Sequence, residues 1–231
     1  LMSNRVLGLA LLLASALVWQ LPAPAEADDH AVEVVTVKGA IDTLTARHVS
    51  RAIDSAGNSG RVLVIQLDTP GGLLSATRDI VKSILGARVP VAVYVSPSGG
   101  QAASAGTFIT AAANFAAMAP GTNIGTASPV GAGGEEIPPT LAKKINEDTR
   151  AFIRSIAAER GRNSEALEET VTLSLSYSAR EALALNGVDF IFDDLEDLLP
   201  KLDGLTARTA SGEVVLDTKD ARSRDFKPTV L

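Results

Sequence analysis

Short runs of apolar, mostly β-branched residues alternate along the chain with longer stretches in which apolar residues recur at helical spacing. The short runs predict buried strands, and the longer stretches predict helices with one apolar face. The expected strands are residues 32–37, 62–67, 89–95, 115–119 and 188–192, and the expected helices are residues 44–56, 73–85, 141–159 and 179–185. Helices between successive strands predict an α/β domain with a mostly parallel sheet, whose ligands bind at the carboxyl ends of the strands.

Polar and glycine residues indicate where these elements end. Gly161 is expected to end the long helix, and Asn163 or Ser164 to cap the helix that follows it. Gly187 is expected to cap the helix over residues 179–185. The chain from Asp203 onward is polar and weakly patterned, so we expect it to be loose, with at most a short hairpin.

The N-terminus follows a different pattern, in which Arg5 precedes a largely apolar run over residues 6–18. Prolines and the sequence Ala25-Glu26-Ala27 come next, an order that is typical of a secretory signal peptide. The alternative is a membrane anchor, but the run is shorter than the roughly 20 apolar residues of a spanning helix. We therefore expect secretion across the inner membrane into the periplasm. The resulting division is a signal peptide over residues 1–27, a folded domain over residues 28–202 and a polar tail over residues 203–231.

The composition excludes several kinds of site. The 231 residues include no cysteine, which rules out disulfides, thiolate metal ligands and cysteine nucleophiles. The two histidines, His30 and His48, are too few for a three-histidine metal site. A net charge of -6 leaves no basic footprint for nucleic acid. We therefore expect no metal, no cofactor and no nucleic-acid partner.

Two loops at the ends of neighbouring predicted strands carry candidate chemistry. The first has Gly71 and Gly72 directly before a helix, where glycine lets a ligand approach the backbone closely. The second has Ser104 at the start of a helix, among alanine and glycine residues. Together they would place the N–H groups of Gly72 and Ala105 on either side of the Ser104 hydroxyl, as a nucleophile with an oxyanion hole. Taken singly, the first loop is also consistent with an ordinary turn, and Ser104 with a helix N-cap.

Five sequence motifs follow one another in a specific order. They are Asp68-Thr69-Pro70-Gly71-Gly72, Ala102-Ala103-Ser104-Ala105-Gly106-Thr107, Met118-Ala119-Pro120-Gly121-Thr122-Asn123-Ile124-Gly125, Ile153-Arg154-Ser155-Ile156-Ala157-Ala158-Glu159-Arg160-Gly161-Arg162-Asn163, and Glu181-Ala182-Leu183 with Gly187-Val188. Together they resemble the protease domain of the NfeD (nodulation formation efficiency D) family, membrane-associated serine proteases of the ClpP/crotonase superfamily. The resemblance spans nearly all of residues 32–195, and it implies a ClpP/crotonase-like spiral of repeated ββα units. Gly71 and Gly100 are then expected to line the cleft that binds an extended peptide.

A serine nucleophile also needs a base that accepts its proton. Neither histidine follows Ser104, where the histidine-using members of the superfamily carry theirs, but a lysine can serve if burial lowers its pKa. The resemblance implies a Ser-Lys dyad with Lys144 as the base, and Lys143 is the alternative. From the residues alone, either lysine is equally consistent with a surface position, in which Lys144 pairs with Asp148 and Lys143 pairs with Glu147.

The resemblance therefore implies a serine endopeptidase that works through an acyl-enzyme. Family members act on hydrophobic segments of membrane proteins, with stomatin-like proteins as typical partners, so we expect such a substrate and a homodimer or higher homo-oligomer. Three alternatives remain open: a signal peptide peptidase-like protease, a crotonase-type acyl-CoA enzyme, and a non-catalytic scaffold of the same fold.

Overall fold

A computed structural model describes residues 31–131 and 138–227 of the chain. A parallel sheet of six strands forms its centre, in the order β11-β1-β2-β3-β5-β8. These strands are β1 (Ala31–Lys38), β2 (Leu63–Asp68), β3 (Val91–Val95), β5 (Phe115–Met118), β8 (Phe190–Ile191) and β11 (Arg222–Asp225). The five strands expected from the hydrophobic runs are confirmed within a few residues. The predicted signal peptide and His30 lie outside the described residues.

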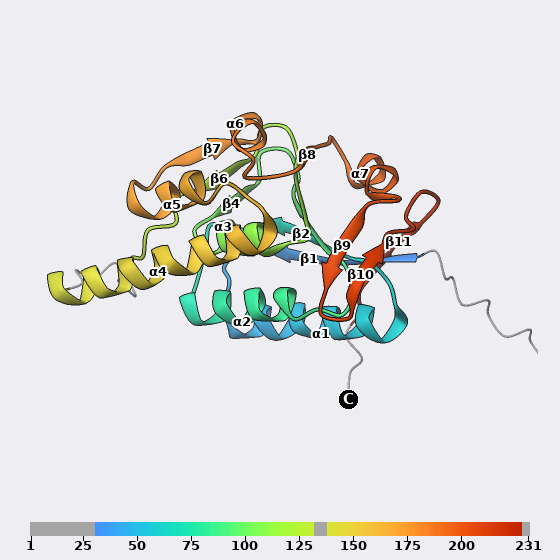
Figure 1. Cartoon of the computed structure of the whole chain (residues 1–231), viewed down its shortest axis with the longest axis horizontal. Helices are drawn as coiled ribbons and strands as arrows, with labels where there is room; N and C mark the ends of the chain where they lie inside the picture. The colour runs from blue at the N-terminus through green and yellow to red at the C-terminus, as the bar shows by residue number, and fades with distance from the viewer. Residues whose placement is uncertain (1–30, 132–137, 228–231) are drawn as a thin grey trace, which may run out of the picture.

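Helices cover both faces of this sheet (Figure 1). One face carries α1 (Thr43–Ser59), α2 (Leu74–Leu85), α3 (Ala105–Ala112) and α4 (Pro139–Arg160), and the other carries α7 (Leu195–Leu202) and the hairpin of β9 (Thr206–Thr209) and β10 (Gly212–Val215). All five residues of β3 are buried, because this central strand has neighbours on both faces. Within the described ranges, no helix combines the length and the apolar character that crossing a membrane requires.

A smaller sheet lies at the end of the central strands. It consists of β4 (Gln101–Ala103), β6 (Asn123–Gly125) and β7 (Ser176–Ser178), with β6 in the middle. The helices α5 (Ser164–Thr172) and α6 (Ala179–Ala184) flank β7 in the sequence. The order β3, β4, α3 is a ββα unit, and the expected ββα arrangement with a mostly parallel sheet is confirmed.

The C-terminal segment differs from its prediction. The expectation of a loose chain with at most a short hairpin after Asp203 agrees with the β9–β10 hairpin but is wrong for residues 222–225, which form the edge strand β11. All four residues of β11 are exposed, and the strand is held by its parallel pairing to β1. Main-chain hydrogen bonds do not depend on side-chain polarity, so a polar sequence leaves no hydrophobic pattern to mark such a strand.

The helix ends follow the predicted signals in two cases out of three. Gly161 ends α4 with a left-handed φ of 66°, and Asn163 caps α5 by accepting hydrogen bonds from Glu165 N and Ala166 N. The Gly187 cap of α6 is wrong, because the left-handed residue after this helix is Asn186, with a φ of 56°. Helix α7 was not predicted, although four of its leucines are buried at helical spacing. These are Leu195, Leu198, Leu199 and Leu202.

Arg162 is a buried cation that joins α3 to the chain after α4. Its side chain is 2% exposed and pairs with Asp189 at 2.9 Å. The guanidinium also donates to the carbonyls of Ala111 and Ala113, at the C-terminal end of α3. A cation there stabilises the unpaired carbonyls of the helix end, so this arginine secures the helix that begins beside Ser104.

Replacing Asp189 with alanine is expected to lower the free energy of unfolding by about 3 to 5 kcal/mol, because it leaves the buried guanidinium without a counter-ion. Urea unfolding followed by circular dichroism measures this loss. Glu159→Ala is the matched control, since it breaks an ion pair to Arg208 in which both side chains are exposed, and we expect a change below about 1 kcal/mol. Equal losses in the two variants would contradict the structural role assigned to Arg162.

Candidate active site

Ser104 lies at a sharp turn between a strand and a helix. It follows β4 directly and precedes α3, with a φ of 51° and a ψ of -110°. A non-glycine residue rarely adopts a positive φ, and holding one costs about 1 to 3 kcal/mol. The turn is held from the backbone, since Ser104 N donates to Gly125 O at 2.8 Å and Thr107 N donates to Ser104 O at 3.0 Å. Such strain is concentrated at functional sites, and a strand-turn-helix of this kind exposes a nucleophile.

The N-cap interpretation of Ser104 is wrong. The residue precedes α3, but its side chain makes no capping hydrogen bond to the helix. Its hydroxyl is half-buried and has no hydrogen-bond partner in the described part of the chain. The small neighbours have a steric reason, because a Cβ at Gly106 would lie 2.8 Å from Thr69 Cγ2 and 3.1 Å from Ala102 Cβ. The Ser104 oxygen is therefore available to a reacting group.

The loop after β2 is attached to the same turn. Thr69 is fully buried, and its backbone bonds to Gln101 O and Ala103 N fasten the loop to β4. Gly71, with a φ of 119°, lies against the serine, because a Cβ there would be 2.7 Å from Ser104 Cβ and 3.1 Å from Ser104 Oγ. Gly71 therefore lies next to Ser104, and any larger residue at position 71 would push against the serine side chain.

Two N–H groups beside Ser104 lack an acceptor within the described residues. Ile41 pairs with Gly72 in a parallel bridge, in which Ile41 N donates to Gly71 O and Leu73 N donates to Ile41 O. In such a bridge the N–H of Gly72 itself points to the opposite side, away from Ile41. Ala105 is the first residue of α3, where the helix offers its N–H no partner.

A cavity of about 370 Å³ opens beside these groups, lined by Gly72, Ser104 and Ala105 together. Its remaining walls are mostly apolar. They include Leu73, Leu74, Phe108, Val130 and Ile145.

Two threonines in the wall add little polarity. The hydroxyls of Thr77 and Thr149 donate to carbonyls of their own helices, to Leu73 O at 2.9 Å and to Ile145 O at 2.7 Å. With their hydroxyls occupied in this way, the cavity suits an apolar side chain of a bound peptide.

Gly100, predicted to bind substrate, is placed differently from Gly71. It is buried in the turn before β4, where its N–H donates to Pro97 O at 2.8 Å and a Cβ would lie 3.3 Å from Asp68 Cγ. It is not among the residues that line the cavity. A contact between Gly100 and a peptide stays a prediction.

Both candidate lysines lie near the start of α4, where the helix extends beyond the body of the molecule (Figure 1). Lys143 and Lys144 are exposed, and the next residue, Ile145, lines the cavity. Buried positions of this helix begin only at Thr149. The segment over residues 132–137, between the cavity wall and α4, lies outside the described residues. The pairing of Ser104 with Lys144 stays a prediction.

The two acidic residues of α4 that were weighed as surface partners of these lysines pair with arginines. Asp148 pairs with Arg78 of α2 at 2.6 Å, and Glu147 pairs with Arg150 at 2.7 Å. Neither Lys143 nor Lys144 forms an ion pair with any described residue. The surface pairings of Lys144 with Asp148 and of Lys143 with Glu147 are therefore not formed. The sequence analysis did not identify Arg78 as the partner of Asp148, because the two residues are 70 positions apart.

Other contacts fix the direction of α4. The Arg78 guanidinium lies 4.2 Å from the centre of the Phe152 ring, which stacks on Phe108 of α3. On the other side, Glu168 of α5 accepts hydrogen bonds from Arg150 and Arg154. Burial raises the pKa of the Glu168 carboxyl, but these two arginines outweigh it and hold the pKa below its usual value.

His48 takes no part in the cavity. It is half-buried on α1, and its ring lies 5.3 Å from that of Phe226 in the C-terminal segment.

Comparison with proteins of known sequence identifies the family of this chain. The family model described as "NfeD1b, N-terminal domain" matches residues 31–210. The membrane-bound protease PH1510 of Pyrococcus horikoshii is 37% identical over 183 residues, which are 77% of this chain and 41% of that protein. The chain thus spans about two fifths of the length of this relative.

Solved structures show the same relationship. The "1510-N membrane-bound stomatin-specific protease" is represented by a lysine-to-alanine mutant in complex with a substrate peptide and by a serine-to-alanine mutant. Both are 35% identical, match 87% of this chain and 93% or 99% of their own, and give TM-scores of 0.79 and 0.78. ClpP1 of Listeria monocytogenes shares the fold alone, at 22% identity over 71% of this chain and 94% of its own, with a TM-score of 0.56. The chain belongs to the family of NfeD1b N-terminal domains and has a ClpP-like fold.

Proposed function

We propose that this protein is a serine endopeptidase that cleaves apolar segments of membrane-associated proteins through an acyl-enzyme. The single observation that carries the proposal is the strained Ser104, whose hydroxyl has no partner among the described residues and lies at an apolar cavity that Gly72 and Ala105 also line. The relatives support it, because the similar 1510-N protein is described as a stomatin-specific protease and one of its solved structures holds a substrate peptide.

Each residue has one role in the proposed reaction. Ser104 Oγ attacks the scissile carbonyl carbon while the Lys144 amine takes the hydroxyl proton. The N–H groups of Gly72 and Ala105 donate to the oxyanion of the tetrahedral intermediate. Lys144 then gives its proton to the leaving amine, and a water molecule repeats the sequence on the ester.

The proposed base must be uncharged, and burial favours the uncharged form of a lysine. In a single copy of the chain, however, the Lys144 side chain is exposed. We therefore propose that a bound peptide or a second subunit covers the start of α4, as a homodimer or higher homo-oligomer would. Exposed apolar side chains surround the cavity and support such a cover. These are Leu73 and Val130 in the cavity wall, and Leu141 lies one helical turn before the lining residue Ile145. A stomatin-like substrate and a periplasmic location after removal of residues 1–27 belong to the same proposal.

The alternatives differ in what they require of Ser104. A crotonase-type acyl-CoA enzyme uses paired oxyanion N–H groups without a nucleophile, and a scaffold needs only the cavity. A signal peptide peptidase-like enzyme uses the same chemistry on another substrate.

A fluorophosphonate probe tests the proposal, because it forms a stable adduct only with an activated serine. We expect one adduct per chain, and peptide mass spectrometry should locate it on Ser104. Cleavage of a hydrophobic peptide by the same preparation should stop as the adduct accumulates. A chain that remains unlabelled after prolonged incubation, or one labelled on Ser128 of the same cavity, would overturn the proposal.

A further inference from the structure

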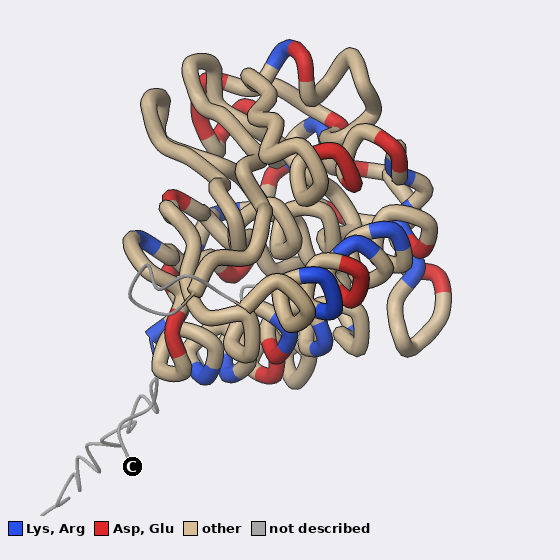
Figure 2. The backbone as a smooth tube through the Cα atoms, turned by 90° about the vertical axis from the view of Figure 1, so that its left-hand side faces the viewer, with Lys and Arg blue, Asp and Glu red and all other residues tan. Residues whose placement is uncertain are grey.

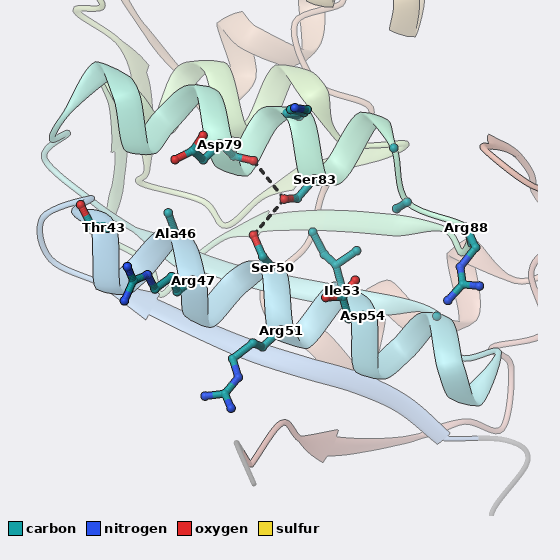
Figure 3. Close-up of a pocket in the computed structure, with 14 residues that line it drawn as sticks. Thr43, Ala46, Arg47, Ser50, Arg51, Ile53, Asp54, Asp79, Ser83 and Arg88 are labelled. Carbon is teal, nitrogen blue, oxygen red and sulfur yellow. Dashed lines mark hydrogen bonds between the residues drawn. The ribbon is translucent and has the colours of Figure 1, made fainter. Parts of the chain in front are cut away.

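A shallow groove of about 830 Å³ runs between α1 and α2, on the side of these helices that faces away from the sheet (Figure 3). A hydrogen bond of 2.8 Å between the hydroxyls of Ser50 and Ser83 joins the two helices along it. Its charged lining consists of four cations and two carboxylates. These are Arg47, Arg51, Lys82, Arg88, Asp54 and Asp79.

The four cations of this groove outnumber its two carboxylates. None of the four cations has an ion pair with a described residue, and Arg88 donates only to the amide oxygen of Asn58, at 3.2 Å. Arg47 and Arg51 are one helical turn apart, where like charges destabilise a helix. Along the lower edge of Figure 2, at the height of α1 and α2 in Figure 1, several basic segments appear with acidic ones between them. In a chain of net charge -6, this is a local excess of the opposite sign.

An acidic surface lies on the opposite face of the sheet, where α7 begins. Asp193, Asp194 and Glu196 line a depression of about 450 Å³ together with Asp225 of β11, and no basic residue lines it. The side chains of Asp193, Asp194, Glu196 and Asp225 are exposed and form no ion pair with a described residue. Tyr94 also lines this depression, and its hydroxyl has a pKa raised to about 12. Burial is the larger cause, and the negative charge of Asp194 and its neighbouring carboxylates adds to it.

We propose that the α1–α2 groove of one copy of the chain binds the acidic α7 surface of a second copy. The two surfaces lie on opposite faces of one sheet, so they cannot meet within a single chain. Arginine binds carboxylates through paired hydrogen bonds, and unlike charges steer two surfaces together. Because the two surfaces differ, the contact is heterologous, and each copy keeps one surface free for a further neighbour. This contact is separate from the Ser104 cavity and does not depend on the proposed peptidase activity.

Sedimentation velocity of the full chain tests the proposal at about 0.1 M and about 1 M salt, where the Debye length is about 10 Å and about 3 Å. We expect the association constant between copies to fall by about tenfold or more at the higher salt concentration. A variant with Arg47→Glu and Arg51→Glu, which reverses the charge of the groove, should lose the salt-sensitive association. A second variant with Asp193→Lys and Glu196→Lys, which reverses the charge of the acidic surface, should lose it as well. Asp194 is left unchanged because its side chain caps α7. Arg180→Glu with Lys219→Glu is the matched control, since it makes the same charge change at exposed residues outside the groove.

Mixing the two reversed variants gives the decisive result. Each variant alone lacks one of the two surfaces that form the contact. The variant with the reversed groove keeps its acidic surface, and the variant with the reversed acidic surface keeps its groove. A mixture of the two variants should therefore regain salt-sensitive association, both through the intact pair of surfaces and through the two reversed surfaces, whose charges are again opposite. Circular dichroism confirms that each variant folds, and Arg47→Gln with Arg51→Gln replaces the groove variant if it does not. The proposal is overturned if the unaltered chain shows no salt-sensitive association, if the matched control loses it equally, or if the mixture forms no complex.

Discussion

Ser104→Ala is expected to abolish labelling by a fluorophosphonate and to reduce peptide turnover by about 10⁵-fold or more, because the attacking oxygen is removed outright. Peptide binding should stay within about threefold of the original, since the cavity walls and both N–H groups remain. Labelling and cleavage rates measure the first effect, and calorimetric titration with an uncleaved peptide measures the second.

Ser128→Ala is the matched control for this substitution. Ser128 lines the same cavity, but its hydroxyl is engaged with Val171 O and Ser174 Oγ and is not available to a reacting group. We expect this variant to keep its labelling and its turnover. Resistance of Ser104 to the fluorophosphonate in the unaltered chain would favour the crotonase-type alternative, and equal peptide binding by the unaltered chain and Ser104→Ala without cleavage by either would favour the scaffold.

Lys144→Ala is expected to slow the acylation of Ser104 by about 10² to 10⁴-fold, the usual contribution of a general base. Lys143→Ala should stay within about threefold. Both lysines are exposed on the first turns of α4 and neither has an ion pair within the described residues, so the two variants remove the same charge from the same helix. Single-turnover labelling, followed from acidic to alkaline pH, measures both rates.

The pH profile separates a base from a structural residue. The original chain and Lys143→Ala should label faster as the pH rises, because only a neutral amine accepts the serine proton. Lys144→Ala should be slow throughout and lose that rise. The reverse ranking of the two variants would move the base to Lys143, and equal rates in both would remove the dyad from the mechanism.

The order of strands and helices followed from the sequence because burial along one element leaves a local signature. All residues of β3 are apolar or aromatic and buried, and the apolar positions of α1 and α2 face the sheet. Gly161 and Asn163 were predictable for the same reason, since a helix end is defined within a few residues.

The missed parts depend on contacts between distant segments. Strand β11 lies beside β1, at the other end of the described chain, and its exposed side chains carry no trace of that pairing. Asn186 takes the left-handed position that was expected of Gly187, because more than one residue type can end a helix and the chain path decides where.

By itself the sequence determined five of the six central strands, the glycine loop and the place of Ser104 at the start of a helix, because each of these is encoded by neighbouring residues. Only the tertiary structure decided that Ser104 is strained and uncapped, that Gly71 touches it, and that an apolar cavity opens beside both. It also decided the partner of an acidic side chain on α4, because Asp148 binds Arg78 from 70 positions away. The spacing of apolar residues indicates which side of one helix or strand is buried. Whether a hydroxyl or a cation has a partner depends on the side chains of other elements that pack against it.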